Sequence, residues 1–244
     1  MDKKLLLRPN LARIMVDYVS QIHALTTLHP SAAETQKLDG SPVTALDLAL
    51  SELLERMSQQ YYPDVNFYSE ENFTGWNFPL LAIDPLDGTR EYIRNRPEWA
   101  ISIAFFESLN FVGEGWVYNP LTKELFNNEL EPSAHVDKAT YYGEVSHSEW
   151  EKKYFQTFKS QKFILTPKGS IAYKLGRLAA GKVDFVISLA PKNIWDIAGG
   201  TLLCQQSKIK FYSQGKEVTE VQPQYLPPLI WCHEEIFAEL SSLV

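Results

Sequence analysis

The sequence predicts an α/β fold whose N-terminal half is of the α+β kind, and three observations support this. Strand-like and helix-like segments alternate after residue 139, which favours helices layered against a sheet. Residues 99–106 and 111–118 are apolar and rich in strand-forming side chains, as in an antiparallel hairpin. An apolar run at 79–83 is bounded by proline and by Asp-Pro and Asp-Gly turns, which indicates a buried strand.

The chain is long enough for one large domain or two small ones, since it has 244 residues and 45% hydrophobic content. The stretch 127–137 is polar and contains proline, so it is the best candidate for a boundary. We therefore predict an α+β subdomain over 1–131 that carries most of the site, and an α/β subdomain over 132–244 that completes it.

The excess of acidic residues limits the partners. Lys and Arg number 23 against 30 Asp and Glu, which gives a net charge of -7. Such a surface repels nucleic acid and anionic membranes, so we expect no nucleic acid as a partner. An anionic substrate would need bound cations or a local basic cluster.

Nothing in the sequence indicates export or membrane insertion. No stretch has the length of a membrane span, and the apolar run near the N-terminus is too short for a signal peptide. Cys204 and Cys232 lack zinc-type spacing. The sequence leaves a disulfide between them open but favours reduced thiols, and we expect a soluble cytoplasmic protein.

The first half begins with a predicted helix over 10–28, because apolar residues recur there at helical spacing. Residues 31–41 are polar and end in Asp39-Gly40, so we expect an exposed, mobile loop. Thr44 is a suitable N-cap for a second helix that runs to about residue 61. Strands are then expected over 65–68, 80–83, 99–106, 111–118 and 124–126.

In the second half, strands and helices alternate. Strands are expected over 140–142, 163–165, 183–187, 208–212 and 228–232, and helices over 148–158, 171–180, from 193 onward and over 234–243. Gly169 and Ser170 open the helix over 171–180, and Gly181 ends it.

The central stretch is 80–92, where two carboxylates, Asp84 and Asp87, follow the predicted strand. The proline between them keeps Asp84 extended, and Gly88 allows a sharp turn. Thr89 is a suitable N-cap for a helix whose free N–H groups would face the carboxylates. Carboxylates bind hard cations and a helix start binds phosphate, which together suit metal-assisted phosphate-ester chemistry. The simpler alternative is that Asp-Pro and Asp-Gly only form turns.

Further acidic positions have both a structural and a functional interpretation. Asp47 falls at the third position of the helix that Thr44 caps, where a carboxylate serves as a cap partner. Glu70 and Glu71 follow a short strand, and adjacent carboxylates are either solvated or neutralised by a cation. Asp196 lies in the first turn of the helix that begins near residue 193, where the helix dipole favours it.

Four pieces of the sequence together resemble the inositol monophosphatase superfamily of magnesium-dependent, lithium-sensitive phosphatases. In order they are Ser41-Pro42-Val43-Thr44-Ala45-Leu46-Asp47, Ser69-Glu70-Glu71, Asp84-Pro85-Leu86-Asp87-Gly88-Thr89 and Trp195-Asp196-Ile197-Ala198-Gly199. The resemblance spans nearly the whole chain. It implies a layered αβαβα sandwich, a small-molecule phosphate ester as substrate, and a monomer or homodimer. In finer detail the chain most resembles the branch of 3'(2'),5'-bisphosphate nucleotidases that act on 3'-phosphoadenosine 5'-phosphate.

The resemblance also implies residue roles. Two or three Mg²⁺ ions would be held by Glu70, Asp84, Asp87 and Asp196 and by the main-chain carbonyl of Leu86, a set that suits oxygen-only coordination. Catalysis would fall to Asp47, Thr89 and Glu70, with Asp47 and Thr89 hydrogen-bonded to the attacking water. The substrate would contact Leu86, Asp87, Gly88, Thr89, Gly169, Ser170, Lys192 and Asp196. The histidines lie outside the four pieces, which disfavours a histidine nucleophile.

One departure weakens the inositol interpretation. Inositol-specific members have an acidic residue shortly before the Trp-Asp pair that contacts the substrate hydroxyls, whereas residues 187–192 carry none. Basic side chains could meet a second phosphate, although each can also be solvated surface; the candidates are Arg90, Arg94, Arg96, Lys168 and Lys192. Two alternatives to the nucleotidase are an inositol-1-monophosphatase or related sugar-phosphate phosphatase, and a non-catalytic protein that binds RNA or the transcription machinery.

Overall fold

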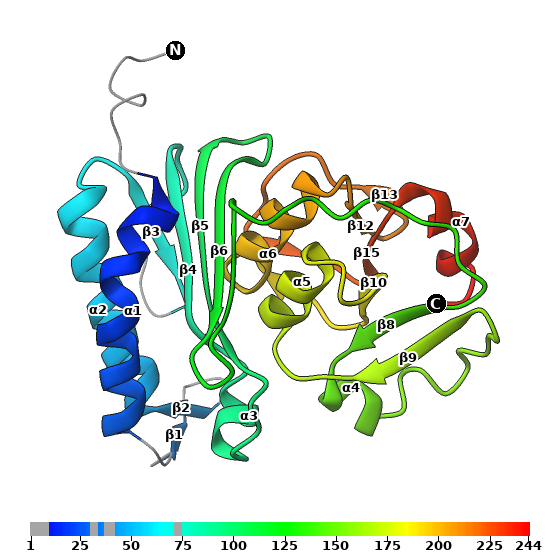
Figure 1. The fold of residues 1–244 in the computed structure, drawn as a ribbon, viewed down its shortest axis with the longest axis horizontal. Helices are drawn as coiled ribbons and strands as arrows, with labels where there is room; N and C mark the ends of the chain where they lie inside the picture. The colour runs from blue at the N-terminus through cyan, green and yellow to red at the C-terminus, as the bar shows by residue number, and fades with distance from the viewer. Residues whose placement is uncertain (1–9, 30–33, 37–41, 71–74) are drawn as a thin grey trace.

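The computed structural model describes residues 10–29, 34–36, 42–70 and 75–244. Its helices are α1 (Leu11–Leu28), α2 (Ala45–Tyr61), α3 (Thr89–Ile93), α4 (His147–Glu151), α5 (Ile171–Ala179), α6 (Ile194–Gln206) and α7 (Glu234–Ser241). Figure 1 shows the layers from left to right: α1 with α2, a five-stranded sheet, α5 with α6, a six-stranded sheet, and α7. The predicted αβαβα sandwich is confirmed.

The five-stranded sheet comes from the first half of the chain. Its strands, in spatial order, are β3 (Asn66–Ser69), β4 (Leu80–Asp87), β5 (Ala100–Ser108), β6 (Val112–Asn119) and β7 (Glu124–Asn127). β3 and β4 are parallel and the other neighbours are antiparallel, so the predicted hairpin is β5 with β6. Leu81 and Ile83 pack with α1 and α2, whereas Leu80 and Ala82 pack with α5 and α6. Both faces of the sheet are buried, which explains the unbroken apolar run in β4.

The six-stranded sheet comes from the second half. In spatial order its strands are β13 (Lys216–Glu217), β12 (Lys210–Ser213), β15 (Leu229–Cys232), β10 (Phe185–Ser188), β8 (Tyr141–Val145) and β9 (Phe163–Pro167). β8 is parallel to β9 and β10, while β15 is antiparallel to β10 and β12. Phe185 and Ile230 of this sheet pack with Ile236 and Leu240 of α7. The sheet is therefore mixed, with α5 and α6 on one face and α7 on the other.

Two of the predicted elements are wrong in extent. Residues 34–36 are not loop but a strand, β1 (Glu34–Gln36), paired antiparallel with β2 (Pro42–Thr44), while 31–33 and 37–41 lie outside the described residues. The helix predicted over 148–158 is only α4, followed by turns. Lys153 has a φ of 61°, in the left-handed region that an α-helix cannot contain. A further short ladder, β11 (Lys192–Asn193) with β14 (Gln224–Tyr225), was not expected.

Cys204 and Cys232 are both buried with free thiols. Among the helices in the described ranges, none is both long enough and apolar enough to cross a membrane. The division at residues 131 and 132 stays a proposal, and the two sheets lie on either side of it in the sequence.

The central helix α6 contacts the five-stranded sheet backbone to backbone. A Cβ placed on Gly115 of β6 would lie 2.3 Å from the carbonyl oxygen of Gly199 in α6. A Cβ on Gly199 would lie 2.8 Å from the carbonyl oxygen of Ile103 in β5. Side chains at these positions would push α6, which begins beside Asp196, away from the sheet that carries Asp84.

A Gly115→Ala substitution is therefore expected to lower the free energy of unfolding by about 1–3 kcal/mol, because the added methyl group meets a backbone carbonyl that cannot turn aside. Urea unfolding followed by circular dichroism measures this. Gly75→Ala is the matched control, since the nearest described atoms to its Cβ belong to side chains, Asn66 Oδ1 at 3.3 Å and Asn77 Nδ2 at 3.7 Å. Equal effects in the two variants would show that the close contact does not determine the packing.

Candidate active site

The acidic motif of the central stretch lies on an irregular end of β4. Ser102 of β5 pairs with Asp84 and Ala100 pairs with Asp87, so three steps along β4 oppose two along β5. Such a bulge redirects side chains from the regular alternation of a strand. The strand was predicted to end at Ile83, but β4 continues through Asp87. Both carboxylates therefore lie on the bulged end of the strand and not after it. The backbone N–H of Leu86 donates to Asp84 Oδ1 at 2.9 Å.

Thr89 does not cap α3 as predicted. The N-cap is Gly88, with a φ of 98°, and it makes no side-chain cap hydrogen bond. Thr89 is the first helical residue, and its hydroxyl lies 3.2 Å from Asp47 Oδ1 and 3.3 Å from the Leu86 carbonyl oxygen. Gly88 is needed here because positive φ is costly for other residues. Because Gly88 and not Thr89 is the N-cap, the Thr89 hydroxyl is not used for capping and donates to Asp47.

Asp47 is the cap partner that the sequence predicts, and it also accepts a hydrogen bond from Thr89. It forms a capping box with Thr44, whose N–H and hydroxyl donate to Asp47 Oδ2 at 2.8 and 2.5 Å. The other oxygen, Oδ1, accepts from Thr89. The side chain is buried, with 3% of the residue exposed. Asp47 is therefore fixed by α2 and in turn orients Thr89.

The start of α5 binds Asp87 across the boundary between the two halves of the chain. Ser170 Oγ donates to Asp87 Oδ2 at 2.5 Å and the Ala172 N–H donates to the same oxygen at 2.6 Å. Ser170 caps α5 and has a φ of 54°, an uncommon conformation that is often found at functional sites. Gly169 is buried, and a Cβ there would lie 2.2 Å from Glu91 Cγ. The second half of the chain thus orients a carboxylate of the first half.

The start of α6 brings Asp196 to the same region. Asn193 and Asp196 form a capping box, in which the Asn193 N–H donates to Asp196 Oδ2 at 2.9 Å. The ring of Trp195 lies 5.2 Å from the ring of Tyr68 in β3, two residues before Glu70. This contact places the end of β3 beside α6, and Glu70, which is exposed, lies close enough to influence both Asp84 and Asp196. Glu71 lies outside the described residues.

The electrostatics of these acids call for a counter-ion. Burial, together with the charges of Asp87, Glu70 and Asp196, raises the pKa of Asp84 well above its usual value. Burial and the neighbouring Asp87 raise the pKa of Asp196 to about 7. Burial also raises the pKa of Asp87, although the Ser170 and Ala172 hydrogen bonds oppose this. Burying like charges together is unfavourable without a compensating cation, so the donor set fits hard divalent ions.

The four acids are neighbours but do not form a closed cage. Within the described ranges, no three of their carboxylates bring one oxygen each to within 4.8 Å of one another. Leu86 is buried beneath them with 1% exposure. An ion would have to draw the carboxylates closer; Glu70, which directly follows β3, is the exposed member of the four.

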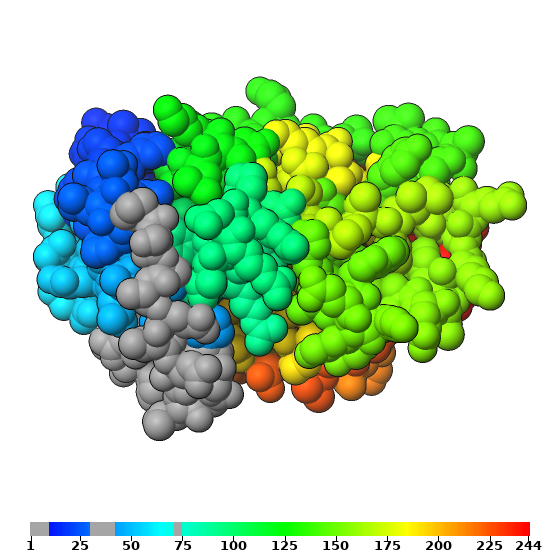
Figure 2. All heavy atoms as spheres, turned by 90° about the horizontal axis from the view of Figure 1, so that it is seen from below, coloured from blue at the N-terminus to red at the C-terminus, as the bar shows by residue number. Residues whose placement is uncertain are grey.

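A cavity of about 190 Å³ lies against these acids, between α3 and the α4 region. Figure 2 shows the corresponding face, where the teal-green atoms around α3 border the yellow-green atoms of the second half. The lining includes predicted substrate residues, namely Asp87, Gly88, Gly169, Ser170, Lys192 and Asp196, but neither Leu86 nor Thr89. Three of the five basic candidates also line it: Arg90, Arg94 and Lys192. Arg96 does not, and Lys168 pairs instead with Glu98 at 3.3 Å.

Sequence reasoning missed the polar residues that join the two halves beside this cavity. Glu98 Oε2 accepts from the Gly169 N–H at 2.8 Å and lies 2.7 Å from His147 Nε2. These bonds and Lys168 hold the pKa of Glu98 below its usual value despite its partial burial, which acts in the opposite direction. No local motif marks Glu98 or His147, because their partners lie 49 to 71 residues away in the sequence.

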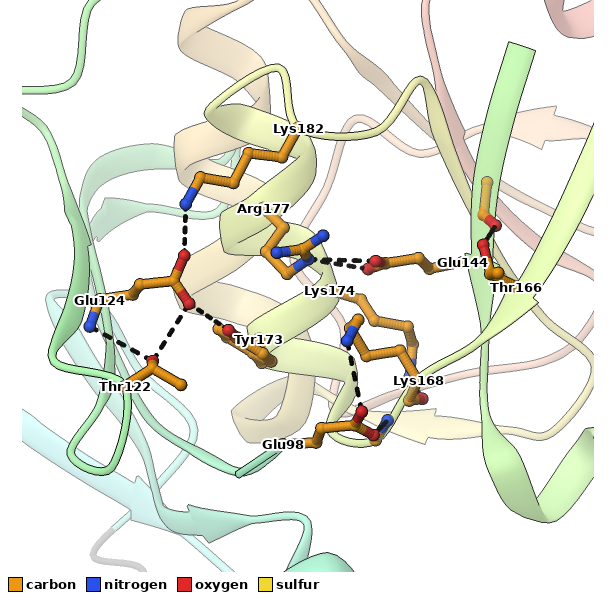
Figure 3. A network of polar contacts seen from close by, with 12 residues as sticks. Glu98, Thr122, Glu124, Glu144, Thr166, Lys168, Tyr173, Lys174, Arg177 and Lys182 are labelled. Carbon is orange, nitrogen blue, oxygen red and sulfur yellow. Dashed lines mark hydrogen bonds and ion pairs between the residues drawn. The ribbon is translucent and has the colours of Figure 1, made fainter. Parts of the chain in front are cut away.

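Figure 3 shows that α5 is the centre of a wider polar network. Tyr173 and Lys182 both donate to Glu124 of β7, which ties α5 to the first sheet. Arg177 pairs with the buried Glu144 of β8 at 3.1 Å, which ties α5 to the second sheet. The orientation of α5, and with it the bond to Asp87, is therefore set from both sides.

An Asp196→Asn variant is expected to be more stable than the parent chain when no divalent ion is present. The folded pKa of Asp196, about 7, exceeds its unfolded value of about 3.9, so the folded state keeps a proton that the unfolded state has released. The parent chain therefore loses stability as the pH rises from about 4 to about 7, and the variant lacks this loss.

In EDTA near pH 8, urea unfolding should show the variant about 2–4 kcal/mol more stable than the parent, with the difference shrinking toward pH 5. The amide oxygen of asparagine can still accept the Asn193 N–H, so the helix cap is retained. Added Mg²⁺ should stabilise the parent far more than the variant. If the variant were less stable than the parent in EDTA, the repulsion among the acids would not be what destabilises the ion-free parent.

Comparisons with known proteins agree with this geometry. The model of the "Inositol monophosphatase family" matches residues 14–207. Among curated proteins, the chain is 24% identical over 216 residues to a fructose-1,6-bisphosphatase/inositol-1-monophosphatase of Thermotoga maritima, covering 83% of each chain. It is 29% identical over 184 residues to the 3'(2'),5'-bisphosphate nucleotidase CysQ of Escherichia coli K12, covering 67% of this chain and 73% of that protein. It is 28% identical over 199 residues to the Nus factor SuhB of Vibrio cholerae, covering 71% of this chain and 72% of that protein.

Solved structures show the same fold. An inositol monophosphatase of Thermotoga maritima superposes with a TM-score of 0.79 at 22% identity, covering 93% of this chain and 95% of the other. An IMPase/NADP phosphatase complexed with Mg²⁺ and phosphate superposes with a TM-score of 0.72 at 19% identity, covering 95% of each. Because the family model spans well over half of its residues, from 14 to 207, the chain belongs to the inositol monophosphatase family.

Proposed function

We propose that this chain is a Mg²⁺-dependent phosphomonoesterase that removes the 3'-phosphate of 3'-phosphoadenosine 5'-phosphate by attack of water. The observation that carries the proposal is the convergence of Asp84, Asp87 and Asp196, whose mutual repulsion calls for divalent cations. Asp87 and Asp196 also line a cavity whose walls include Arg90, Arg94 and Lys192. Metal-dependent hydrolysis of a phosphate ester requires acidic residues that bind the cations and basic groups that bind the phosphate.

In this proposal Glu70, Asp84, Asp87 and Asp196 hold two or three Mg²⁺ ions, and the carbonyl oxygen of Leu86 supplies a neutral ligand. When bound, Mg²⁺ lowers the pKa of water and offsets the charge of the phosphate. The chain contributes ligands that are held in place before binding, by the Leu86 N–H, the start of α5 and the capping box of α6. Such orientation of metal ligands by their neighbours supports affinity.

Asp47 and Thr89 position the attacking water. The Thr89 hydroxyl donates to Asp47 Oδ1, so a lone pair of its oxygen is left to accept a proton from water. The proton passes from water to Thr89 and from Thr89 to the Asp47 carboxylate, in the manner of general base catalysis. The water oxygen forms the new P–O bond, the ester P–O bond breaks on the opposite side, and the departing sugar oxygen takes up a proton from a solvent water molecule, while Asp47 returns its proton to solvent. No covalent phosphoenzyme is formed.

The phosphate is held by backbone donors, the N–H groups of Gly88 and Thr89 at the start of α3. Gly169 and Ser170 line the cavity at the start of α5, where the Gly169 N–H donates to Glu98 and the Ser170 hydroxyl donates to Asp87. Fixed donors of this kind stabilise the charge that develops in the transition state. Gly88 and Gly169 allow this approach because both positions are too crowded for a Cβ.

Arg90, Arg94 and Lys192 favour a substrate with a second phosphate. All three line the cavity, and Lys192 lies near enough to Asp87 and Asp196 to lower the pKa of both, against the effect of burial. The segment before Trp195 supplies no acid for inositol hydroxyls, since residues 187–192 contain none. The similarity to the nucleotidase of Escherichia coli points the same way.

The two alternatives rest on other relatives. The Thermotoga protein named as a fructose-1,6-bisphosphatase and inositol-1-monophosphatase favours a sugar phosphate as substrate. The Nus factor SuhB of Vibrio cholerae favours a role in transcription. Every proposed metal ligand is present in this chain and the net charge is -7, so catalysis is the better supported of these functions.

Asp84→Asn and Thr89→Ala should each lower kcat by about 10²–10⁴-fold while the fold is retained, because one weakens ion binding and the other removes the group that receives the proton. Steady-state phosphate release with Mg²⁺ measures this. Thr89→Ser keeps the hydroxyl and should recover most of the activity. Full activity of Asp84→Asn would refute the proposed ion site, and an inactive parent chain on every phosphate ester tested would favour the transcription role.

Substrate choice is tested by comparing 3'-phosphoadenosine 5'-phosphate, inositol 1-phosphate and fructose 1,6-bisphosphate, with and without lithium. The nucleotide should have the highest kcat/KM, and lithium should inhibit. Lys192→Ala and Arg90→Ala should raise KM for the nucleotide about 10–100-fold, the loss of one charge-assisted contact, and affect inositol 1-phosphate less. Arg56→Ala, whose exposed side chain pairs with Glu52 in α2, is the control. Preference for a sugar phosphate would replace the nucleotidase proposal with the first alternative.

A further inference from the structure

A second hollow lies in the C-terminal half, away from the acidic site. A cavity of about 780 Å³ opens between the segment 132–135, the end of α6 and the start of α7, and a smaller one of about 240 Å³ adjoins it. The two share His135 and His233 in their walls, and neither shares a lining residue with the cavity beside Asp87. In Figure 1, α7 lies at the opposite end of the molecule from α1 and α2.

Three potential metal ligands converge where these cavities meet. His135, His233 and Glu235 each offer one ligand atom, and these atoms all lie within 4.8 Å of one another, the one such group in the described part of the chain. The two imidazole rings are 5.2 Å apart with their planes tilted by 55°, so they do not stack. Donor atoms around a tetrahedral ion lie about 3.3–3.5 Å apart, given metal–ligand distances near 2.1 Å. Glu235 is exposed on the first turn of α7, so its side chain can adjust when an ion binds.

The surroundings hold the imidazoles ready to bind. The ring of His135 lies parallel to that of Tyr141, at 6.2 Å and 7°, and its Nε2 lies 3.2 Å from Asp137 Oδ1. A carboxylate on one ring nitrogen orients the other toward an ion, as in many histidine–metal sites. His233 is the N-cap residue of α7 and is partly buried, so the start of the helix fixes its position.

The neighbouring charges are already paired, which leaves Glu235 for an ion. Lys210 binds Glu217 at 3.0 Å and Glu234 at 2.8 Å. Lys138 binds Asp184 at 2.5 Å. No lysine or arginine ion pair involves Glu235 among the described residues. Within the described residues, no lysine or arginine therefore competes with an ion for the Glu235 carboxylate.

We propose that His135, His233 and Glu235 form a second metal site, chemically distinct from the acidic one, that binds Zn²⁺. Two imidazoles and one carboxylate suit Zn²⁺ and its neighbours Co²⁺, Ni²⁺ and Cu²⁺, whereas Mg²⁺ requires oxygen ligands. Bound there, the ion links the connection between the two sheets, which carries His135, to the start of α7. The three residues all line the large cavity, and a water molecule or an anionic ligand would complete the coordination of the ion.

The test is isothermal titration of Zn²⁺ into the full-length chain with the acidic site saturated by excess Mg²⁺, followed by Co²⁺ titration with visible spectroscopy. We expect one strong site and a tetrahedral Co²⁺ spectrum. His135→Ala, His233→Ala and Glu235→Gln should each weaken Zn²⁺ binding at least about tenfold, and Zn²⁺ should raise the Tm of the parent only. Since Glu235 is exposed, its variant should fold normally, which circular dichroism checks.

Glu234→Gln, on the adjacent position of α7, and His29→Ala, at the end of α1, are the matched controls and should bind Zn²⁺ as the parent does. Binding that persists in the His135→Ala/His233→Ala double variant would overturn the proposal, because it would place the ion at the carboxylates or on the surface. Equal weakening in Glu234→Gln would overturn it too, since the effect would then be one of charge. The Zn²⁺ titrations do not depend on phosphatase activity, so they test the second metal site separately from the proposed function.

Discussion

The repulsion among the buried Asp84 and the half-buried Asp87 and Asp196 is the constraint on which this structure depends. Each carboxylate is costly to bury as an ion, and each makes the others costlier. The pKa values move accordingly, that of Asp196 to about 7. In the proposed function, a divalent cation would convert this repulsion into attraction, so these acids would become its binding site.

The fold holds these acids together through elements from both halves of the chain. The bulge in β4 presents Asp84 and Asp87, the first turn of α5 binds Asp87, and the capping box of α6 fixes Asp196. Glu98 ties the segment before β5 to the start of α5. Because no single element carries the set, the site exists only when the two sheets are packed around α5 and α6. The close contact between Gly115 and Gly199 is part of this requirement.

Local chemistry explains which features were predictable from sequence. The capping boxes of Thr44 with Asp47 and of Asn193 with Asp196 involve residues three apart, so helix starts and the position of both acids followed from sequence pattern. Thr89 was assigned as the N-cap on the same rule, and this was wrong because Gly88 can adopt a left-handed φ that Thr cannot adopt cheaply. Helix propensity overestimated α4, since a left-handed Lys153 follows it.

Contacts between distant segments could not be predicted in this way. His147 and Glu98 reach the cavity through partners far away in the sequence, and neither has a distinctive neighbour. The pairing of residues 34–36 with 42–44 was not predicted either, because the composition of 31–41 resembles that of any polar loop. Likewise His135 and Glu235 are about a hundred residues apart in the chain, and only the folding of the connecting segment against α7 brings them together.

The most direct test of the central claim is a crystal structure of the chain grown with Mn²⁺ in place of Mg²⁺, with the ions located by anomalous scattering. The account predicts at least two peaks between Glu70, Asp84, Asp87 and Asp196, with carboxylate oxygens about 2.1–2.3 Å from each ion. An absence of anomalous density at these acids, with ions bound elsewhere or not at all, would contradict it.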